Sequence, residues 1–205
     1  MKFTKTAIAT ILATAISSGA YAADLVEPEK TYFEEVVVGE LHAIQDTKQV
    51  YIAPLVSENV EIEEPRADIR NRPGQEWVLE PEEHAGIQEM YLQAMERRFS
   101  NENFVIVEQP GADTLVIRAE LTELEPLAPK DDRHNRYPSD TYYTEGAGDA
   151  EITIAVTLNG ETILEATDER HMGNRWQEND RFHNKVEFRR LMSRWANALM
   201  NQLDA

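Results

Sequence analysis

The sequence predicts an α+β fold, a two-layer sandwich in which two helices cover one face of a mixed, largely antiparallel sheet. Two long stretches carry apolar residues every three or four positions, the period of an amphipathic helix, and shorter stretches alternate apolar and polar residues as strands do. Their order is strand, helix, three or four strands, helix, which places both helices on the apolar face of one sheet. We therefore expect a single domain over residues 49–205.

Residues 1–22 have the pattern of a signal peptide. Lys2 and Lys5 precede an apolar run at residues 7–16, and the small residues Ala20 and Ala22 form a cleavage pattern. The run is shorter than the about 18 apolar residues that cross a bilayer, and no later stretch reaches that length. We expect cleavage after Ala22, a periplasmic location and no transmembrane segment.

The chain is acidic and contains no cysteine. It has 38 Asp and Glu against 20 Lys and Arg, a formal net charge of −18 at pH 7. Because this charge repels phosphate backbones and anionic headgroups, we expect no nucleic-acid partner. Without cysteine, disulfides, thiolate metal sites and the lipid-bearing residue of a lipoprotein are excluded, so we expect no lipid anchor.

The first strand follows an acidic stretch, residues 23–48, which we predict to be an N-terminal arm laid over the domain. Residues 49–57 have the composition of a strand, and Pro54 marks an edge or a break in it. Its core candidates are Val50, Ile52 and Leu55. Residues 58–80 show neither the apolar period of a helix nor that of a strand, and they are predicted to be a connecting segment.

The first helix is predicted at residues 81–102. Pro81 suits a first helical turn, and the carboxylates of Glu82 and Glu83 lie where the helix dipole favours negative charge. Its apolar face consists of Ile87, Tyr91, Ala94, Met95 and Phe99.

Strands are predicted next at residues 104–107 and 113–124, and residues 149–171 predict a hairpin around Asn159-Gly160. A two-residue turn would place Glu165 and Thr167 opposite the isoleucines of the first hairpin strand. A three-residue loop with a glycine bulge would place Leu164 and Ala166 there instead. We favour the three-residue loop because it buries apolar side chains.

The second helix is predicted at residues 179–203, with Asn179 or Asp180 as its cap. The apolar positions are Phe188, Leu191, Met192, Trp195, Leu199 and Leu203. A basic row follows another arc of this helix at Arg181, Lys185 and Arg189, and Arg190 and Arg194 repeat the step beside it. These residues either pair with the carboxylates of the domain or form a docking surface for an acidic partner or a wall polymer.

The segment DERHMGNRW, residues 168–176, has two interpretations. One is a metal or acid/base cluster of Asp168, Glu169 and His171 with His183, which would make the protein a metal-assisted hydrolase. The other is a strand end with solvated charges, where Asp168 pairs with Arg170 or caps a turn. We favour the second, because the histidines lack a metalloprotease spacing, and we expect no catalytic residue, no metal and no cofactor.

The irregular residues 125–148 are predicted to be either a recognition loop or an insertion without function. Tyrosine and arginine are enriched where proteins bind partners. The candidate binding residues here are Arg133, Arg136, Tyr137, Tyr142 and Tyr143.

Several short motifs appear in the order found in one bacterial family. They are Pro110-Gly111 before Asp113-Thr114-Leu115, the hairpin entry from Gly146 to Glu151, Gly160-Glu161 at the turn, and Asp168. Over most of residues 48–203 the chain resembles the bacterial envelope family catalogued as domain of unknown function 3313. The resemblance implies a small exported protein without established catalytic residues, and this chain departs from the lipoproteins of that family by lacking the cysteine. We expect a non-enzymatic module that binds or scaffolds an envelope protein or wall component.

Overall fold

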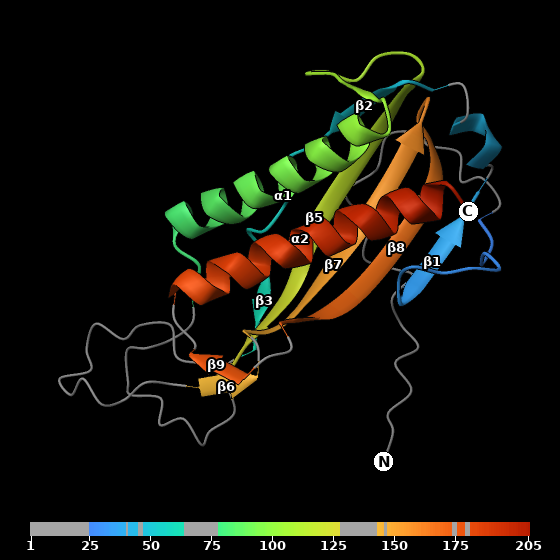
Figure 1. The fold of residues 1–205 in the computed structure, drawn as a ribbon. Helices are drawn as coiled ribbons and strands as arrows, with labels where there is room; N and C mark the ends of the chain where they lie inside the picture. Colours follow the sequence, from blue (N-terminus) through green and yellow to red (C-terminus); the bar gives the residue numbers. More distant parts are fainter. Residues whose placement is uncertain are drawn as a thin grey trace.

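The computed structural model describes residues 25–39, 41–44, 47–63, 78–127, 143–145, 147–173, 176–178 and 181–205. Within these ranges, the two long helices lie side by side on one face of a seven-stranded mixed sheet (Figure 1). This confirms the predicted α+β sandwich. The predicted signal peptide lies outside the described residues. No helix in the described ranges is both long and apolar enough to cross a membrane.

The main sheet has the strand order β1-β8-β7-β5-β2-β4, with β3 paired to β5 on the same edge as β2. The pairs β1·β8, β8·β7 and β7·β5 are antiparallel, and β5·β2, β5·β3 and β2·β4 are parallel. The bounds are β1 (Glu35–Val38), β2 (Gln49–Ile52), β3 (Glu61–Ile62), β4 (Val105–Ile106), β5 (Thr114–Pro126), β7 (Gly148–Leu158) and β8 (Glu161–Met172). A separate two-stranded sheet joins β6 (Tyr143–Glu145) to β9 (Trp176–Glu178).

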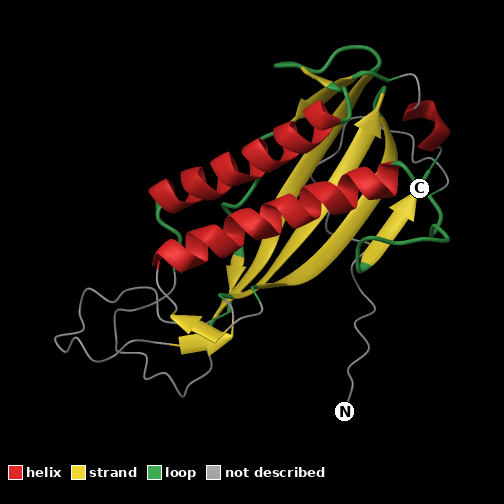
Figure 2. Cartoon of the chain, viewed as in Figure 1, coloured by secondary structure: helices red, strands yellow, loops and turns green. Residues whose placement is uncertain are grey.

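The two helices begin and end close to their predicted bounds. Helix α1 (Pro81–Asn101) starts with a capping box, in which the backbone N–H of Glu80 donates to Glu83 Oε2 over 2.8 Å. Helix α2 is Arg181–Leu203. All predicted core positions of both helices are buried except Ala94, which is half-buried. Both helices lie on the same face of the sheet (Figure 2).

The first predicted strand is interrupted at Pro54, as its sequence indicated. Strand β2 ends at Ile52, and the chain then continues along β5, where the N–H of Val56 donates to the carbonyl of Ala119 over 3.0 Å. Proline has no N–H to offer a neighbouring strand, so the regular ladder stops there. The predicted core residues Val50, Ile52 and Leu55 are buried.

The prediction of a three-residue hairpin loop was wrong, although its consequence for the core was right. Leu158 pairs with Glu161, so the turn is the two residues Asn159-Gly160, both with positive φ (53° and 83°). Thr157 pairs with Thr162 but Val156 pairs with Leu164, which leaves Ile163 as an extra residue in β8. This bulge, and not the loop, turns Leu164 and Ala166 toward the core.

The stretch predicted as an N-terminal arm contributes to the sheet. Residues 35–38 form β1, which pairs antiparallel with β8, and Leu41–Ile44 form a short 3-10 helix, η2. Phe33, Val36 and Val38 are all buried in the common core. The folded unit therefore includes residues before position 49.

Candidate functional site

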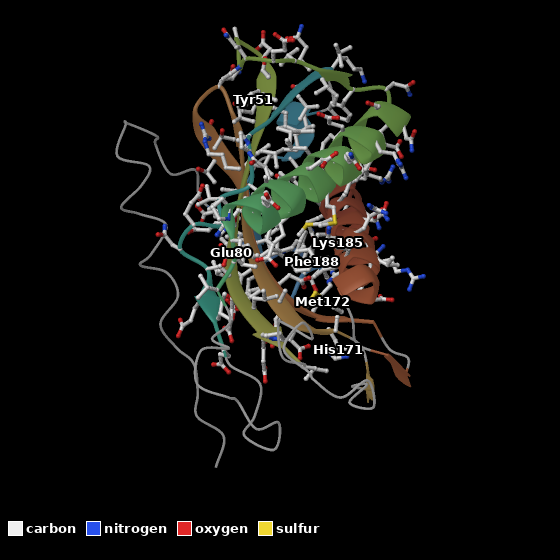
Figure 3. All side chains as sticks on the ribbon, turned by 90° about the vertical axis from the view of Figure 1, so that its left-hand side faces the viewer. Tyr51, Glu80, His171, Met172, Lys185 and Phe188 are labelled. Atoms are coloured by element: carbon white, nitrogen blue, oxygen red, sulfur yellow. The ribbon has the colours of Figure 1, made fainter. Side chains whose placement is uncertain are left out.

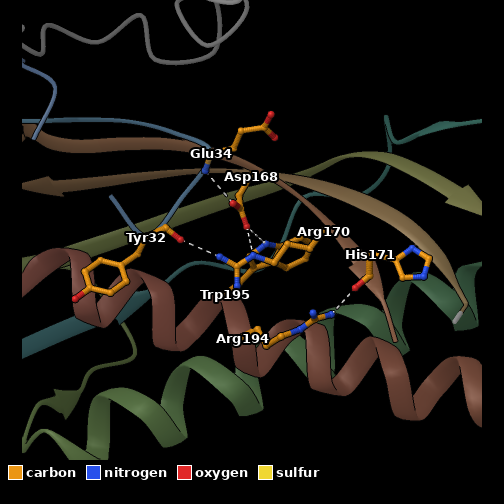
Figure 4. Close-up of polar contacts among 7 residues, drawn as sticks. All are labelled: Tyr32, Glu34, Asp168, Arg170, His171, Arg194 and Trp195. Carbon is orange, nitrogen blue, oxygen red and sulfur yellow. Dashed lines mark hydrogen bonds and ion pairs between the residues drawn. The ribbon is translucent and has the colours of Figure 1, made fainter. Parts of the chain in front are cut away.

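Asp168, the first residue of the segment DERHMGNRW, is buried, and both of its carboxylate oxygens accept hydrogen bonds. Its side chain shares the helix-covered face of β8 with Leu164 and is 4% exposed. The backbone N–H of Glu34 donates to Oδ1 over 3.0 Å, while Trp195 Nε1 (2.8 Å) and Arg170 Nε donate to Oδ2 (Figure 4). The predicted Asp168–Arg170 pair is confirmed, but Asp168 is not solvated.

The same network holds the chain before β1. We call residues 30–38 the N-terminal strap. Arg170 Nη2 donates to the carbonyl of Tyr32 over 2.9 Å, and the buried amide of Gln202 bonds both the N–H of Tyr32 and the carbonyl of Lys30, each over 3.0 Å. Side chains of β8 and α2 thus bind the backbone of the N-terminal strap.

His171 lies on the opposite face of β8 from Asp168, because side chains alternate along a strand. Its Nδ1 is 2.9 Å from Asp149 Oδ1 on β7, and its carbonyl accepts from Arg194 Nη2 over 2.6 Å. The structure therefore does not bring Asp168 and His171 together, and the side chain of His183 lies outside the described residues. Among the side chains that the structure describes, no three His, Asp or Glu groups are placed to hold a metal.

The basic side chains of α2 that the structure describes divide into two groups. Arg190 pairs with the buried carboxylate of Glu187, and Arg194 bonds the carbonyl of His171. Burial lowers the pKa of Arg194, and the positive charge of Arg170 lowers it further, while Glu187 and Asp168 oppose the shift. Arg190 and Arg194 therefore bond to other groups of the same domain.

Lys185 and Arg189, one turn apart on α2, are instead exposed. Neither forms an ion pair with a carboxylate in the described part of the chain. Figure 3 shows Lys185 on α2 and His171 near the end of β8. Pairing with internal carboxylates therefore accounts for Arg190 and not for these two residues.

The other candidate binding residues are described in part or not at all. Arg133, Arg136, Tyr137 and Tyr142 lie outside the described residues. Tyr143 begins β6 and Arg181 begins α2, but their side chains are not described. Their predicted role in binding stays a prediction.

One polar contact was not predicted from the sequence. Ser57 Oγ lies 2.8 Å from His84 Nδ1, and the N–H of Ser57 donates to Glu58 Oε2 over 3.1 Å. Hydrogen bonds from the backbone N–H groups of Glu58 and Ser57 lower the pKa of Glu58, and His84 adds to the effect. Because Ser57 is only 3% exposed, we interpret the contact as a tie between the first turn of α1 and the sheet edge. The two residues are 27 positions apart with no motif between them, so no sequence signal identified it.

A protein-family model matches residues 43–199, which is most of the chain. The chain belongs to the family described as Protein of unknown function, DUF3313. This confirms the family resemblance seen in the motifs. The matched range of this DUF3313 chain includes Asp168, Arg170 and Trp195, whereas the N-terminal strap precedes it.

Two of the solved structures that match the DUF3313 chain share little sequence with it. Protein XCC0632 from Xanthomonas campestris, of family DUF330, is 9% identical with a TM-score of 0.45, over 91% of this chain and 98% of that one. A dodecameric PelC variant from Paraburkholderia phytofirmans is 10% identical with a TM-score of 0.37, over 72% and 86%. Neither likeness carries an argument about function. No curated protein matches the chain.

Proposed function

We propose that this DUF3313 chain is an exported, non-catalytic module that binds or scaffolds a component of the cell envelope. Its docking surface is the exposed basic pair Lys185 and Arg189 on α2, and the partner is an acidic envelope protein or wall polymer. The observation that carries the proposal is that these two cations are exposed, one turn apart, on a chain of net charge −18. Complementary charge steers such encounters and orients the partner.

The non-catalytic part of the proposal is supported by how Asp168 is used. Three protein donors occupy its oxygens, and His171 is on the other face of the strand. A general base must instead have a free oxygen within reach of a substrate proton. The positions of the described residues therefore do not support a metal-assisted hydrolase.

Export is supported by the sequence of residues 1–22, whose two lysines, apolar run and small residues fit a cleaved signal. The periplasm is the compartment in which an acidic partner of the envelope would be met. A protein without cysteine also has no thiol that the oxidising conditions there could convert to a disulfide.

The test is binding to a defined acidic probe, polyglutamate, followed by capture from a solubilised envelope fraction. Lys185→Glu with Arg189→Glu should weaken polyglutamate binding at least about tenfold at low salt, and added salt should weaken binding by the wild type. Arg97→Glu with Lys48→Glu is the matched control, since it changes the charge by the same amount at two exposed cations outside α2. Equal binding by the α2 double variant and the control would refute the α2 surface.

A third variant tests the loop as the rival surface. Arg133→Glu with Arg136→Glu changes charge by the same amount as the α2 double variant. If this variant alone loses the envelope partner while the α2 variant retains it, the recognition surface is the loop that the sequence indicated.

A further inference from the structure

The N-terminal strap is recognised mainly through its backbone. Gln202 bonds the carbonyl of Lys30 and the N–H of Tyr32, Arg170 bonds the carbonyl of Tyr32, and Asp168 accepts from the N–H of Glu34. These contacts fall on the alternate residues 30, 32 and 34, in the bent stretch that leads into β1. Proteins that bind extended peptides use main-chain hydrogen bonds of this kind for affinity and a few pockets for specificity.

In the part of the strap that precedes β1, the side chain of Phe33 enters the core. Phe33 is 4% exposed, whereas its neighbours Glu34 and Glu35 are exposed. The contact set is thus an apolar anchor flanked by main-chain hydrogen bonds, which is how a peptide is bound in a groove.

The remaining strap residues add an edge strand to the sheet. Residues 35–38 pair antiparallel with Leu164 to Thr167 of β8, and the N–H of Gly39 donates to the carbonyl of Ile163 over 2.9 Å. An edge of β8 therefore accepts a strand that is four residues long. We call the groups that hold the strap, namely the side chains of Asp168, Arg170 and Gln202 and this edge of β8, the groove.

The side chains that form the groove are far from the strap in sequence. The hydrogen bonds join residues 134 to 172 positions apart, and the strap is covalently continuous with the rest of the sheet only through the residues before β2. A strap from a second copy would make the same contacts as the chain's own. Exchange of an identical element between copies is an established route to dimers.

We propose that the groove is a strand acceptor, and that the N-terminal strap of one copy occupies the groove of a second copy. Covalent attachment gives the resident strap an effective concentration of about millimolar, so exchange is favoured at high protein concentration or after partial unfolding. The groove includes neither Lys185 nor Arg189, so strand exchange is independent of the basic pair of α2.

Cysteine cross-linking tests the exchange, because the chain has no cysteine of its own. Val37 pairs directly with Glu165 across β1 and β8, so their Cα atoms are about 4.5–5.5 Å apart, within the range of a disulfide. One preparation carries Val37→Cys alone and another carries Glu165→Cys alone. After they are mixed at high concentration in low urea, diluted and oxidised, we expect a disulfide-linked heterodimer.

The controls make either outcome decisive. The double variant in one copy should form an internal disulfide, and failure to do so would overturn the strap position itself. Val37→Cys mixed with Glu151→Cys on β7 measures random collision, since Glu151 pairs with Glu123 and Glu169 and not with β1. A heterodimer yield at least about five times this background supports the exchange, and a yield equal to background refutes it.

A synthetic strap peptide of residues 28–39 gives a second measurement on the full chain under the same conditions. Glu34→Pro in the peptide removes the N–H that Asp168 accepts, whereas Thr31→Pro places proline at an exposed residue of the same segment. The Glu34→Pro peptide should suppress the heterodimer much less than the Thr31→Pro peptide. Equal suppression would contradict recognition through the backbone.

Discussion

Trp195 of α2 donates its indole N–H to the carboxylate of Asp168 in β8 over 2.8 Å, and both side chains are buried (Figure 4). The bond joins the helix layer to the sheet. Asp168 also accepts from Glu34 and Arg170, so one carboxylate connects α2, β8 and the N-terminal strap. The residue that resembled a catalytic acid in the sequence is a structural tie.

Replacing Trp195 separates the hydrogen bond from the packing. Trp195→Phe retains an aromatic ring but leaves the buried Asp168 without one donor, so it should lower the free energy of unfolding by about 1–3 kcal/mol. Trp195→Ala also removes a fully buried ring and should cost about 3–5 kcal/mol. Urea denaturation measures both values. A phenylalanine variant as stable as the wild type would show that the bond contributes nothing.

The elements that the sequence predicted well depend on local periodicity. Both helices and the hairpin have apolar patterns of period 3.6 or 2, and Leu164 was placed on the core face by burial alone. The pairing of β1 with β8 could not be read in this way, because its partners are over 120 residues apart. The environment of Asp168 was missed for the same reason, since Glu34 and Trp195 are distant in sequence.

Gly148 permits a close approach between β7 and β5. It has φ of 130°, and a Cβ there would lie 2.1 Å from the carbonyl oxygen of Glu125. Gly148→Ala should therefore destabilise the fold by at least about 1 kcal/mol through strain and displacement of β5. This close approach also gives a physical reason for the glycine in the hairpin-entry motif.

The matched control is Gly86→Ala in α1, where a Cβ meets nothing within 4 Å. Alanine favours the helix over glycine by about 0.5–1 kcal/mol, so this variant should be more stable than the wild type. Thermal denaturation compares the two variants. Equal effects of the same sign would contradict the assigned backbone at both positions.

Tyr91 is fully buried, and its hydroxyl has no hydrogen-bond partner among the described residues. Tyr91→Phe removes a polar group that is desolvated on folding, so its stability at pH 7 should equal or exceed that of the wild type. A loss above about 1 kcal/mol would reveal a partner for the hydroxyl.

The same burial raises the pKa of Tyr91 above its usual value. The unfolded chain ionises this phenol near pH 10 and the folded chain does not, so its contribution is complete below about pH 10 and is lost as pH rises further. Wild-type stability should therefore fall more steeply above pH 10 than that of Tyr91→Phe. Parallel curves from urea denaturation at pH 9 to 11 would contradict this assignment.

The last prediction concerns the mature N-terminus. Signal peptidase selects small residues before the cut, and Ala20 and Ala22 provide them after the apolar run, so the secreted chain should begin at Ala23. This cleavage would place the N-terminal strap, residues 30–38, close to the new terminus. Only a short segment would then precede the strap and move with it when it leaves the groove. Intact-mass measurement of periplasmic protein tests the site directly, and Ala22→Arg should block processing. If the protein keeps Met1 and stays in the cytoplasm, export and the envelope partner are both excluded, while the cross-linking test of strap exchange is unaffected.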